Sequence, residues 1–101
     1  METRISKSDV MRKLGNFVTV RNARSTNCNN VPNQFILTFE NGEVFQSYES
    51  LIGAKIGRQL YLTADHEYSN TTSRYCCLWC GLSCAERRAG TAKGEIILIE
   101  D

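Results

Sequence analysis

A β-hairpin signal in the middle of the chain restricts the possible folds more than any other stretch. Two runs rich in β-branched and aromatic residues, 34–39 and 44–48, flank the dipeptide Asn41-Gly42. Asn-Gly is strongly preferred in tight hairpin turns, because both central residues of such a turn need positive φ. Apolar residues occupy alternate positions of the first run, as in a strand with one buried face. We therefore expect an antiparallel hairpin here.

Similar patterns on both sides of this hairpin predict further strands. Residues 51–56 and 59–63 carry a second hairpin signal, and the β-branched run 17–20 predicts an earlier strand. The Asn-rich segment 22–33, which holds the only Pro, is interpreted as a loop. Four consecutive apolar residues at 96–99 predict a final buried strand, with a packed extended tail as the alternative.

The N-terminal part of the chain carries a short helix signal. Ser6 can cap a helix that has Asp9 in its first turn, and Gly15 is a natural stop. Val10 and Leu14 give this helix an apolar face. A helix of two to three turns is marginal in water, so we expect it to depend on packing against the sheet.

The stretch 65–82 contains the only Trp and the only His, and it holds the clearest helix start in the C-terminal half. Its capping candidates are followed by an apolar stripe at helical spacing, formed by Tyr75, Leu78, Trp79 and Leu82. We expect this stripe to dock the helix on the hairpins and Gly81 to end or kink it. Ser83 and Glu86 then form a capping-box pattern, which predicts a second short helix through Ala89, stopped by Gly90 or Gly94.

These signals together predict an α+β fold. We expect an antiparallel sheet of about five strands arranged as a hairpin meander, with a short N-terminal helix and a C-terminal helix pair packed on it. The 101 residues can bury one core but not two independent ones, so residues 1–101 are predicted to form a single domain.

Charge and hydropathy narrow the classes of function. The formal net charge of +1 is typical neither of an acidic mimic of nucleic acid nor of a strongly basic nucleic-acid binder. The cations are nevertheless concentrated in the first 24 residues. The chain has no apolar run near the ~20 residues that span a bilayer and no signal-peptide pattern. We therefore expect a protein of the host cytoplasm with no membrane partner.

The cysteines invite comparison with a metal site. Cys77, Cys80 and Cys84 fall at positions i, i+3 and i+7, which would align them on one helical face, and His66 lies nearby in the sequence. Structural zinc sites usually combine two Cys-x-x-Cys pairs, whereas this stretch has one. We interpret the cysteines as core or partly exposed thiols and expect no cofactor. A small zinc-binding module and a redox pair remain as alternatives.

Catalytic motifs are not evident in the sequence. Asp65, His66 and Glu67 could serve acid–base chemistry, but consecutive residues of a polar turn rarely point at one substrate, so we interpret them as a surface turn. The chain has no nucleophile elbow, phosphate-binding glycine loop or two-His zinc motif. We therefore expect a protein that is not an enzyme.

Several motifs of the chain point to a family. They are Ser-Tyr-Glu-Ser-Leu-Ile-Gly-Ala-Lys at 47–55, Leu-Tyr-Leu-Thr at 60–63, and a Tyr-Ser-x-Thr-Thr-x-x-Tyr helix start at 68–75. Over about residues 34–101, the chain resembles a family of small uncharacterised proteins of bacteriophages and mobile elements. The resemblance implies hairpins with a docked helix and a phage-like origin, but no reaction. It also implies that Cys80 replaces an apolar core residue, and that residues 1–33 form a variable helix, strand and loop.

The resulting hypothesis is a small phage or mobile-element accessory protein that acts by binding a host protein. Its role would be that of a stoichiometric inhibitor of a host defence system such as a CRISPR effector, and thus anti-CRISPR-like. The alternative is a nucleic-acid-binding regulator that uses the basic N-terminal region. A second copy of the chain is a further candidate partner. The residues expected to contact a partner are Arg12, Lys13, Arg21, Arg24, Asn29, Asn30, Ser69, Asn70 and Arg74.

Overall fold

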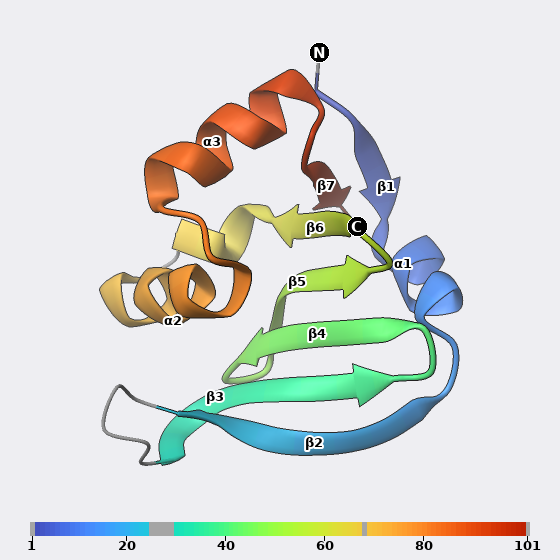
Figure 1. Ribbon diagram of the computed structural model, residues 1–101, viewed down its shortest axis with the longest axis vertical. Coiled ribbons are helices and arrows are strands. Elements are labelled where there is room, and N and C mark those ends of the chain that lie inside the picture. The colour runs from blue at the N-terminus through green and yellow to red at the C-terminus, as the bar shows by residue number, and fades with distance from the viewer. Residues whose placement is uncertain (1, 25–29, 68, 101) are drawn as a thin grey trace.

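A seven-stranded sheet with helices on both of its faces forms the protein (Figure 1). The computed structural model describes residues 2–24, 30–67 and 69–100. The elements in chain order are β1 (Arg4–Ser6), α1 (Lys7–Leu14), β2 (Phe17–Arg24), β3 (Asn30–Phe39), β4 (Gly42–Ser47), β5 (Ser50–Ile56), β6 (Gln59–Thr63), the 3-10 helix η1 (Ala64–Glu67), α2 (Asn70–Cys80), α3 (Cys84–Lys93) and β7 (Ile97–Glu100). The strand order in the sheet is β1-β7-β6-β5-β4-β3-β2.

The predicted antiparallel meander is confirmed for the strands β2 to β6, which pair in sequence order. The prediction of about five strands was too low, however, and the sheet is mixed. β7 lies parallel to both β6 and β1, with Leu98 opposite Leu62 on one side and opposite Arg4 on the other. β1 has only three residues, too few for a period-two pattern, so only the partner strand reveals it.

The predicted loop 22–33 is largely strand. β2 continues to Arg24 and β3 already begins at Asn30, while residues 25–29 lie outside the described part of the chain. Asn22 stands opposite Phe35 in the ladder, and its side-chain amide donates to the carbonyl of Val31 at 3.2 Å. Pairing between two long strands thus overrides the low strand propensity of Asn, because propensity in sheets depends on the context.

The central hairpin forms as predicted, but the reason given for its glycine was wrong. The turn residues are Glu40 and Asn41, and Gly42 opens β4 opposite Phe39. Neither turn residue nor Gly42 has a positive φ. Gly42 is needed for space, since a Cβ atom there would lie 2.1 Å from the backbone oxygen of Lys55.

The hairpin turn also fixes the end of α1. The backbone N–H of Asn41 donates to the carbonyl of Leu14 at 3.0 Å, and its side-chain amide donates to the carbonyl of Lys13 at 3.1 Å. The Glu40 carboxylate accepts from the backbone N–H of Asn16 at 2.7 Å. These bonds satisfy the last carbonyl groups of α1, which a helix cannot pair by itself.

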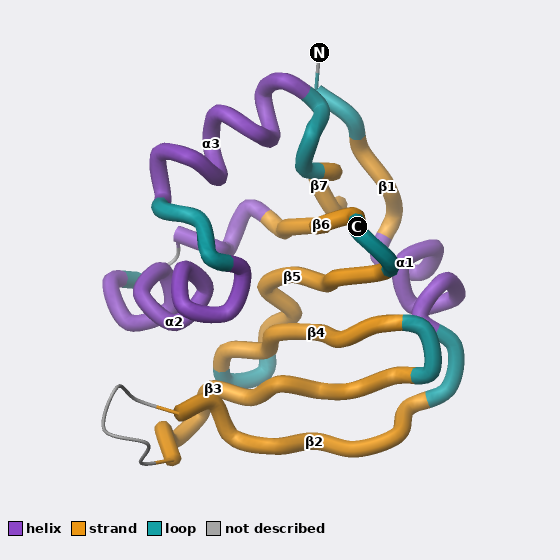
Figure 2. Tube along the Cα trace, in the orientation of Figure 1, coloured by secondary structure: helices purple, strands orange, loops and turns teal. Residues whose placement is uncertain are grey.

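Apolar side chains form two cores on opposite faces of the sheet. Val10 and Leu14 of α1 pack with residues such as Phe39, and we call this side the α1 face. Cys76 of α2 packs on the other side with residues such as Ile36, and we call it the α2 face. Successive residues of each strand contribute to different cores, as the alternation of side chains requires. Figure 2 shows α1 at the end of the sheet away from α2 and α3.

All three predicted helices are present, with the predicted caps. Ser6, Ser69 and Ser83 are the N-caps, and the Ser83–Glu86 capping box is complete. Gly81 ends α2 in the left-handed region, which favours glycine. α3 runs to Lys93 and is capped by Gly94, the later of the two glycines expected to stop it. Within the described part of the chain, no helix combines the length and apolar character needed to cross a membrane.

Candidate functional site

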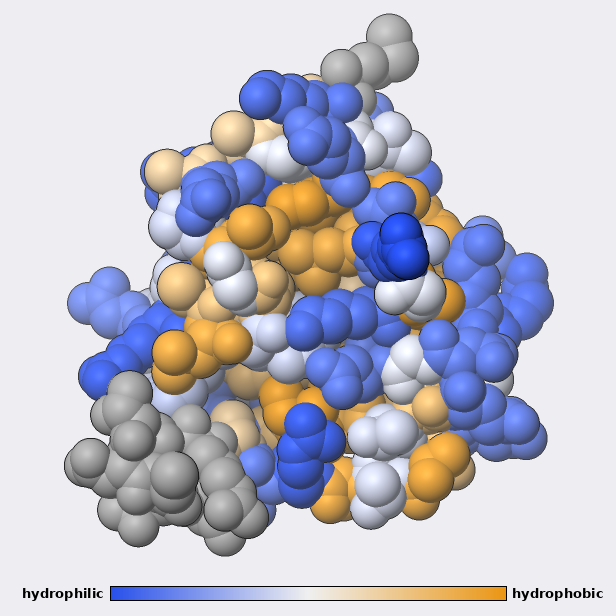
Figure 3. All heavy atoms as spheres, in the orientation of Figure 1, coloured by the Kyte–Doolittle hydropathy of each residue, from blue (hydrophilic) through white to orange (hydrophobic). Residues whose placement is uncertain are grey.

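A groove of about 340 Å³ lies on the α2 face, between α2 and the strands β2 to β4. We call it the α2 groove. One side comes from β2, the floor from β3 and β4, and the other side from α2. Its lining residues are Arg21, Asn22, Ala23, Ile36, Glu43, Tyr75, Leu78 and Trp79. Figure 3 shows that apolar side chains reach the surface in several separate areas of the molecule, surrounded by hydrophilic ones.

The strand register builds the floor of the α2 groove. Arg21 of β2 stands opposite Ile36 of β3, which stands opposite Phe45 of β4, so the three side chains form one row across the sheet. Trp79 of α2 stacks on Phe45, with ring centroids 5.8 Å apart and an interplanar angle of 27°. Its ring also lies against Gly53, where a Cβ atom would be 3.0 Å from it. The absence of a side chain at position 53 thus lets Trp79 approach the sheet.

Polar contacts hold Trp79 in place. Its indole N–H donates to the carboxylate of Glu43 at 2.9 Å, and its backbone carbonyl accepts from Lys55 Nζ at 2.6 Å. The same Nζ lies 4.7 Å from the centre of the indole ring and 3.7 Å from the Glu43 carboxylate. Lys55 therefore compensates the charge of Glu43. The α2 groove therefore has a fixed aromatic wall. The one carboxylate among its described lining residues is already paired.

Arg21 and Leu78 are the available side chains of the α2 groove. Arg21 makes no ion pair or side-chain hydrogen bond within the described residues. Leu78 is 53% exposed, although its place in the apolar stripe predicted that it would dock on the hairpins. The buried residues of α2 are Cys76 and Thr72, so the side of the helix that faces the sheet is not centred on the predicted stripe. The prediction for Leu78 was therefore wrong.

The structure separates the residues that were predicted to bind a partner. Arg12 and Lys13 lie in the last turn of α1, on the α1 face, and Arg12 pairs with Asp9 at 2.8 Å. Arg21 lies on the α2 face, so the predicted basic N-terminal surface is not continuous. Asn29 lies outside the described residues, and for Arg24 and Asn30 only the backbone is described.

The predicted residues at the start of α2 have mainly local contacts. Ser69 caps the helix, because its hydroxyl accepts from the backbone N–H of Thr72 at 3.1 Å. Asn70 and Arg74 are exposed, and the guanidinium of Arg74 lies 5.9 Å from the centre of the Tyr75 ring. Of the predicted residues, Arg21 alone lines the α2 groove. The α2 side of the groove had one signal in the sequence, namely the unusual width of the apolar stripe on α2. One face of a helix cannot bury so wide a stripe, so part of it must stay exposed.

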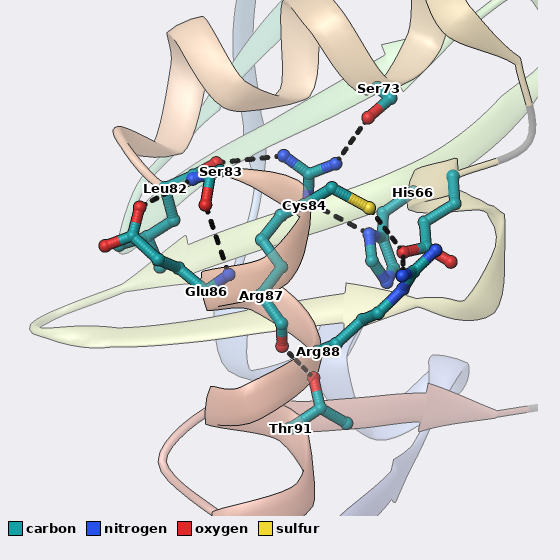
Figure 4. A network of polar contacts seen from close by, with 10 residues as sticks. His66, Ser73, Leu82, Ser83, Cys84, Glu86, Arg87, Arg88 and Thr91 are labelled. Carbon is teal, nitrogen blue, oxygen red and sulfur yellow. Dashed lines mark hydrogen bonds and ion pairs between the residues drawn. The ribbon is translucent and has the colours of Figure 1, made fainter.

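A second polar centre joins α2, η1 and α3 around a fully buried arginine, Arg87 (Figure 4). Its guanidinium donates to Nδ1 of His66 at 2.9 Å, to the hydroxyl of Ser73 at 2.7 Å and to the carbonyl of Leu82 at 2.9 Å. A buried arginine is tolerated when its donors are satisfied. Arg87 thus connects three segments that the sequence alone leaves unrelated.

Residues 65–67 were interpreted as a surface turn, and this interpretation was wrong for His66. These residues belong to the 3-10 helix η1, in which His66 is only 8% exposed. Its neighbour Glu67 accepts from the Cys84 thiol and pairs with Arg88. The Cys84 contact and, second to it, the Arg88 contact lower the pKa of Glu67. The His66 side chain faces inward because Arg87 needs an acceptor there.

This burial predicts that the stability of the protein depends on pH. Desolvation, followed by the charge of Arg87, lowers the pKa of His66 below its ordinary value of 6.5. The unfolded chain therefore binds the proton more readily than the folded one, so the free energy of unfolding falls as the pH drops below 6.5. We expect the denaturant midpoint to be lower at about pH 5.5 than at about pH 7.5, before carboxylates titrate. The thiol of Cys80, with a pKa of about 6, also titrates in this range, so the comparison is made in proteins that carry Cys80→Ser. There, the same decrease with His66→Gln as with His66 would contradict this assignment.

The cysteines of the C-terminal half do not act as one group. Cys76 is buried, whereas Cys77, Cys80 and Cys84 are partly exposed. Cys84 donates to Glu67 at 2.5 Å, and this contact raises the pKa of its thiol. Among the described residues, no three Cys, His, Asp or Glu side chains are placed to hold a metal ion together.

The thiol of Cys80 has a lowered pKa. A hydrogen bond with the thiol of Cys76 lowers the pKa of Cys80 to about 6, and the charges of Arg87 and Lys55 add to the effect. The same contact, together with burial, raises the pKa of Cys76. Since the thiolate is the reactive form, we expect iodoacetamide at neutral pH to label Cys80 before Cys84, and Cys76 only after unfolding. Mass spectrometry of the labelled peptides measures this order, and equal labelling rates for Cys80 and Cys84 would refute it.

Comparison with known proteins places the chain in a family without identifying an activity. No curated protein and no solved structure matches it. A model of a family of unknown function, DUF8033, matches residues 13–97, which include every strand from β2 to β6 and all residues that line the α2 groove. Because this match spans most of the sequence, the chain belongs to the DUF8033 family.

Proposed function

We propose that the protein acts by binding another protein through the α2 groove. The observation that carries this proposal is the exposure of Leu78 beside a fixed aromatic wall and an arginine that has no ion-pair partner among the described residues. A groove that combines an exposed apolar side chain with aromatic residues and an arginine resembles the centre of a protein interface, where aromatic residues and arginine are enriched.

The packing around Trp79 supports this role. The ring is held by Phe45, Glu43 and Lys55 without any partner. A surface that is already ordered loses less conformational entropy on binding, which leaves more of the contact energy for affinity. The α2 groove is therefore suited to bind with its walls in place.

The biological setting that we propose follows from the small size of the chain and from its phage-like motifs. The protein would be an accessory protein of a phage or mobile element, active in the host cytoplasm as a stoichiometric inhibitor of a defence system such as a CRISPR effector. Binding without turnover suits this role, because one inhibitor chain is consumed for each target molecule.

A nucleic-acid-binding function is the second candidate. The observation in its favour is Arg21 beside Tyr75 and Trp79, since arginine and aromatic rings can stack on unpaired bases. Arg12 and Lys13 of the predicted basic region lie on the α1 face and cannot extend a path for the phosphate backbone from Arg21. Binding to nucleic acid would weaken steeply as the salt concentration rises.

The experiment compares capture by two variants with matched substitutions. Leu78→Asp places a charge in the α2 groove, while Met11→Asp places one on an exposed apolar residue of α1, on the opposite face. With tagged protein in bacterial host lysate, we expect a captured protein that Met11→Asp retains and Leu78→Asp loses by at least about tenfold, as at a binding hot spot. Equal capture by both variants would exclude the α2 groove, provided that both unfold at the wild-type temperature.

A further inference from the structure

The charges around the α2 groove are unevenly compensated. Glu43, its carboxylate, is paired with Lys55 at 3.7 Å and accepts the Trp79 indole N–H. Arg21, its cation, has no such partner within the described residues. Its neighbour Asn22 already uses its side-chain amide on the carbonyl of Val31. The groove therefore presents one free positive charge to a ligand.

The position of Arg21 sets the geometry of such a ligand. The register places it in the same row as Ile36, while the exposed Leu78 stands on the opposite wall. Ala23, two residues after Arg21 on β2, has a small side chain and does not add height to the β2 side of the groove. A ligand that lies in the groove thus meets a cation on one side and an apolar surface on the other.

We propose that the α2 groove binds an acidic amphipathic segment of its partner protein; this inference rests on the function proposed above. A carboxylate of the segment pairs with Arg21, whose planar guanidinium matches a carboxylate with two parallel hydrogen bonds. An apolar side chain next to that carboxylate packs on Leu78 and Ile36. The apolar floor lowers the local dielectric constant, which strengthens the ion pair relative to one in open solvent.

The observations favour an acidic segment over a nucleic acid, although phosphate would also pair with arginine. The exposed Leu78 is aliphatic and gives a base no stacking surface, while the Trp79 ring is already stacked on Phe45. The cations Arg12 and Lys13 lie on the other face of the sheet, out of reach of the same ligand.

Selection from a display library of random dodecapeptides tests this inference. The wild-type protein is compared with Arg21→Glu, which reverses the charge, and with Leu78→Asp, which spoils the apolar wall. Arg12→Glu reverses an exposed charge on the α1 face and serves as the matched control. On wild type and Arg12→Glu we expect peptides with Asp or Glu next to an apolar residue. On Arg21→Glu the acidic preference should disappear and the selected peptides should bind at least tenfold more weakly.

The outcomes separate this inference from the function on which it rests. Two outcomes would overturn the inference and leave the groove as a binding site. In the first, the selected peptides depend on Leu78 but show no preference for acidic residues; in the second, the acidic preference persists on Arg21→Glu. Peptides that bind Leu78→Asp as well as wild type would overturn both, and so would a failure to enrich any peptide on wild type. If a single-stranded DNA oligonucleotide displaced the selected peptides from wild type and did not bind Arg21→Glu, the ligand of the groove would be a nucleic acid and not an acidic segment.

Discussion

Replacing Arg87 by alanine is expected to lower the free energy of unfolding by about 3–5 kcal/mol, because it leaves buried acceptors unpaired and opens a cavity. The side chain is fully buried and donates to three neutral acceptors, on η1, α2 and the segment before α3. Its removal leaves these acceptors without donors, each at about 1–3 kcal/mol, and it opens a cavity between the helices. Urea unfolding of the two proteins at neutral pH measures the difference.

The next residue of α3 supplies the control. Arg88 has the same charge, but its side chain is 67% exposed and its ion pair with Glu67 is in contact with solvent. Arg88→Ala should therefore shift the urea midpoint much less than Arg87→Ala does. Arg87→Met, which restores most of the volume without the donors, separates the hydrogen bonds from the packing. A wild-type stability in Arg87→Ala would show that the network contributes nothing to the fold.

Replacing Gly42 by alanine is expected to cost about 3 kcal/mol, at the upper end of the range for overpacking. The added Cβ would lie 2.1 Å from the backbone oxygen of Lys55 and 3.1 Å from the Leu14 side chain. The first neighbour is backbone of the adjacent strand β5, which cannot move without breaking the β4–β5 ladder. Thermal unfolding followed by circular dichroism measures the loss.

Gly57 provides a comparison in which space is not limiting. It lies in the turn between β5 and β6 with a φ of +61°, and a Cβ atom there would have no neighbour within 4 Å. Gly57→Ala should therefore cost only the backbone strain of a left-handed residue, about 1–2 kcal/mol. If Gly57→Ala proved more damaging than Gly42→Ala, close approach to Lys55 would not be the reason for the glycine in the central hairpin.

Local signals predicted the helices and the meander. A capping serine acts on backbone groups two or three residues away, so Ser6, Ser69 and Ser83 could be identified from the sequence. The hairpins were likewise visible as alternating runs with short turns. Contacts between distant segments could not be identified in this way. β1 exists because β7 pairs with it, and η1 buries His66 because Arg87, 21 residues later, needs an acceptor.

The α2 groove was missed because a bulge in β2 sets which side chains form it. Phe17 and Arg21 are four residues apart and would share a face in a regular strand. The register shifts by one residue between Phe17 and Thr19, so Phe17 packs edge to face against Phe39 at the α1 face while Arg21 stands opposite Ile36 at the α2 face. No pattern in the residues 17–24 marks this shift. Arg21 was therefore grouped with Arg12 and Lys13 by charge alone.

The central claim, that the α2 groove is the surface that binds a partner, is tested most directly by site-specific photo-crosslinking in host cells. A photo-reactive amino acid replaces Leu78 in one variant and Met11 in the other, both exposed on helices but on opposite faces of the sheet. We expect a discrete crosslinked protein from position 78 and none from position 11. Crosslinking from position 11 with none from position 78 would contradict the claim.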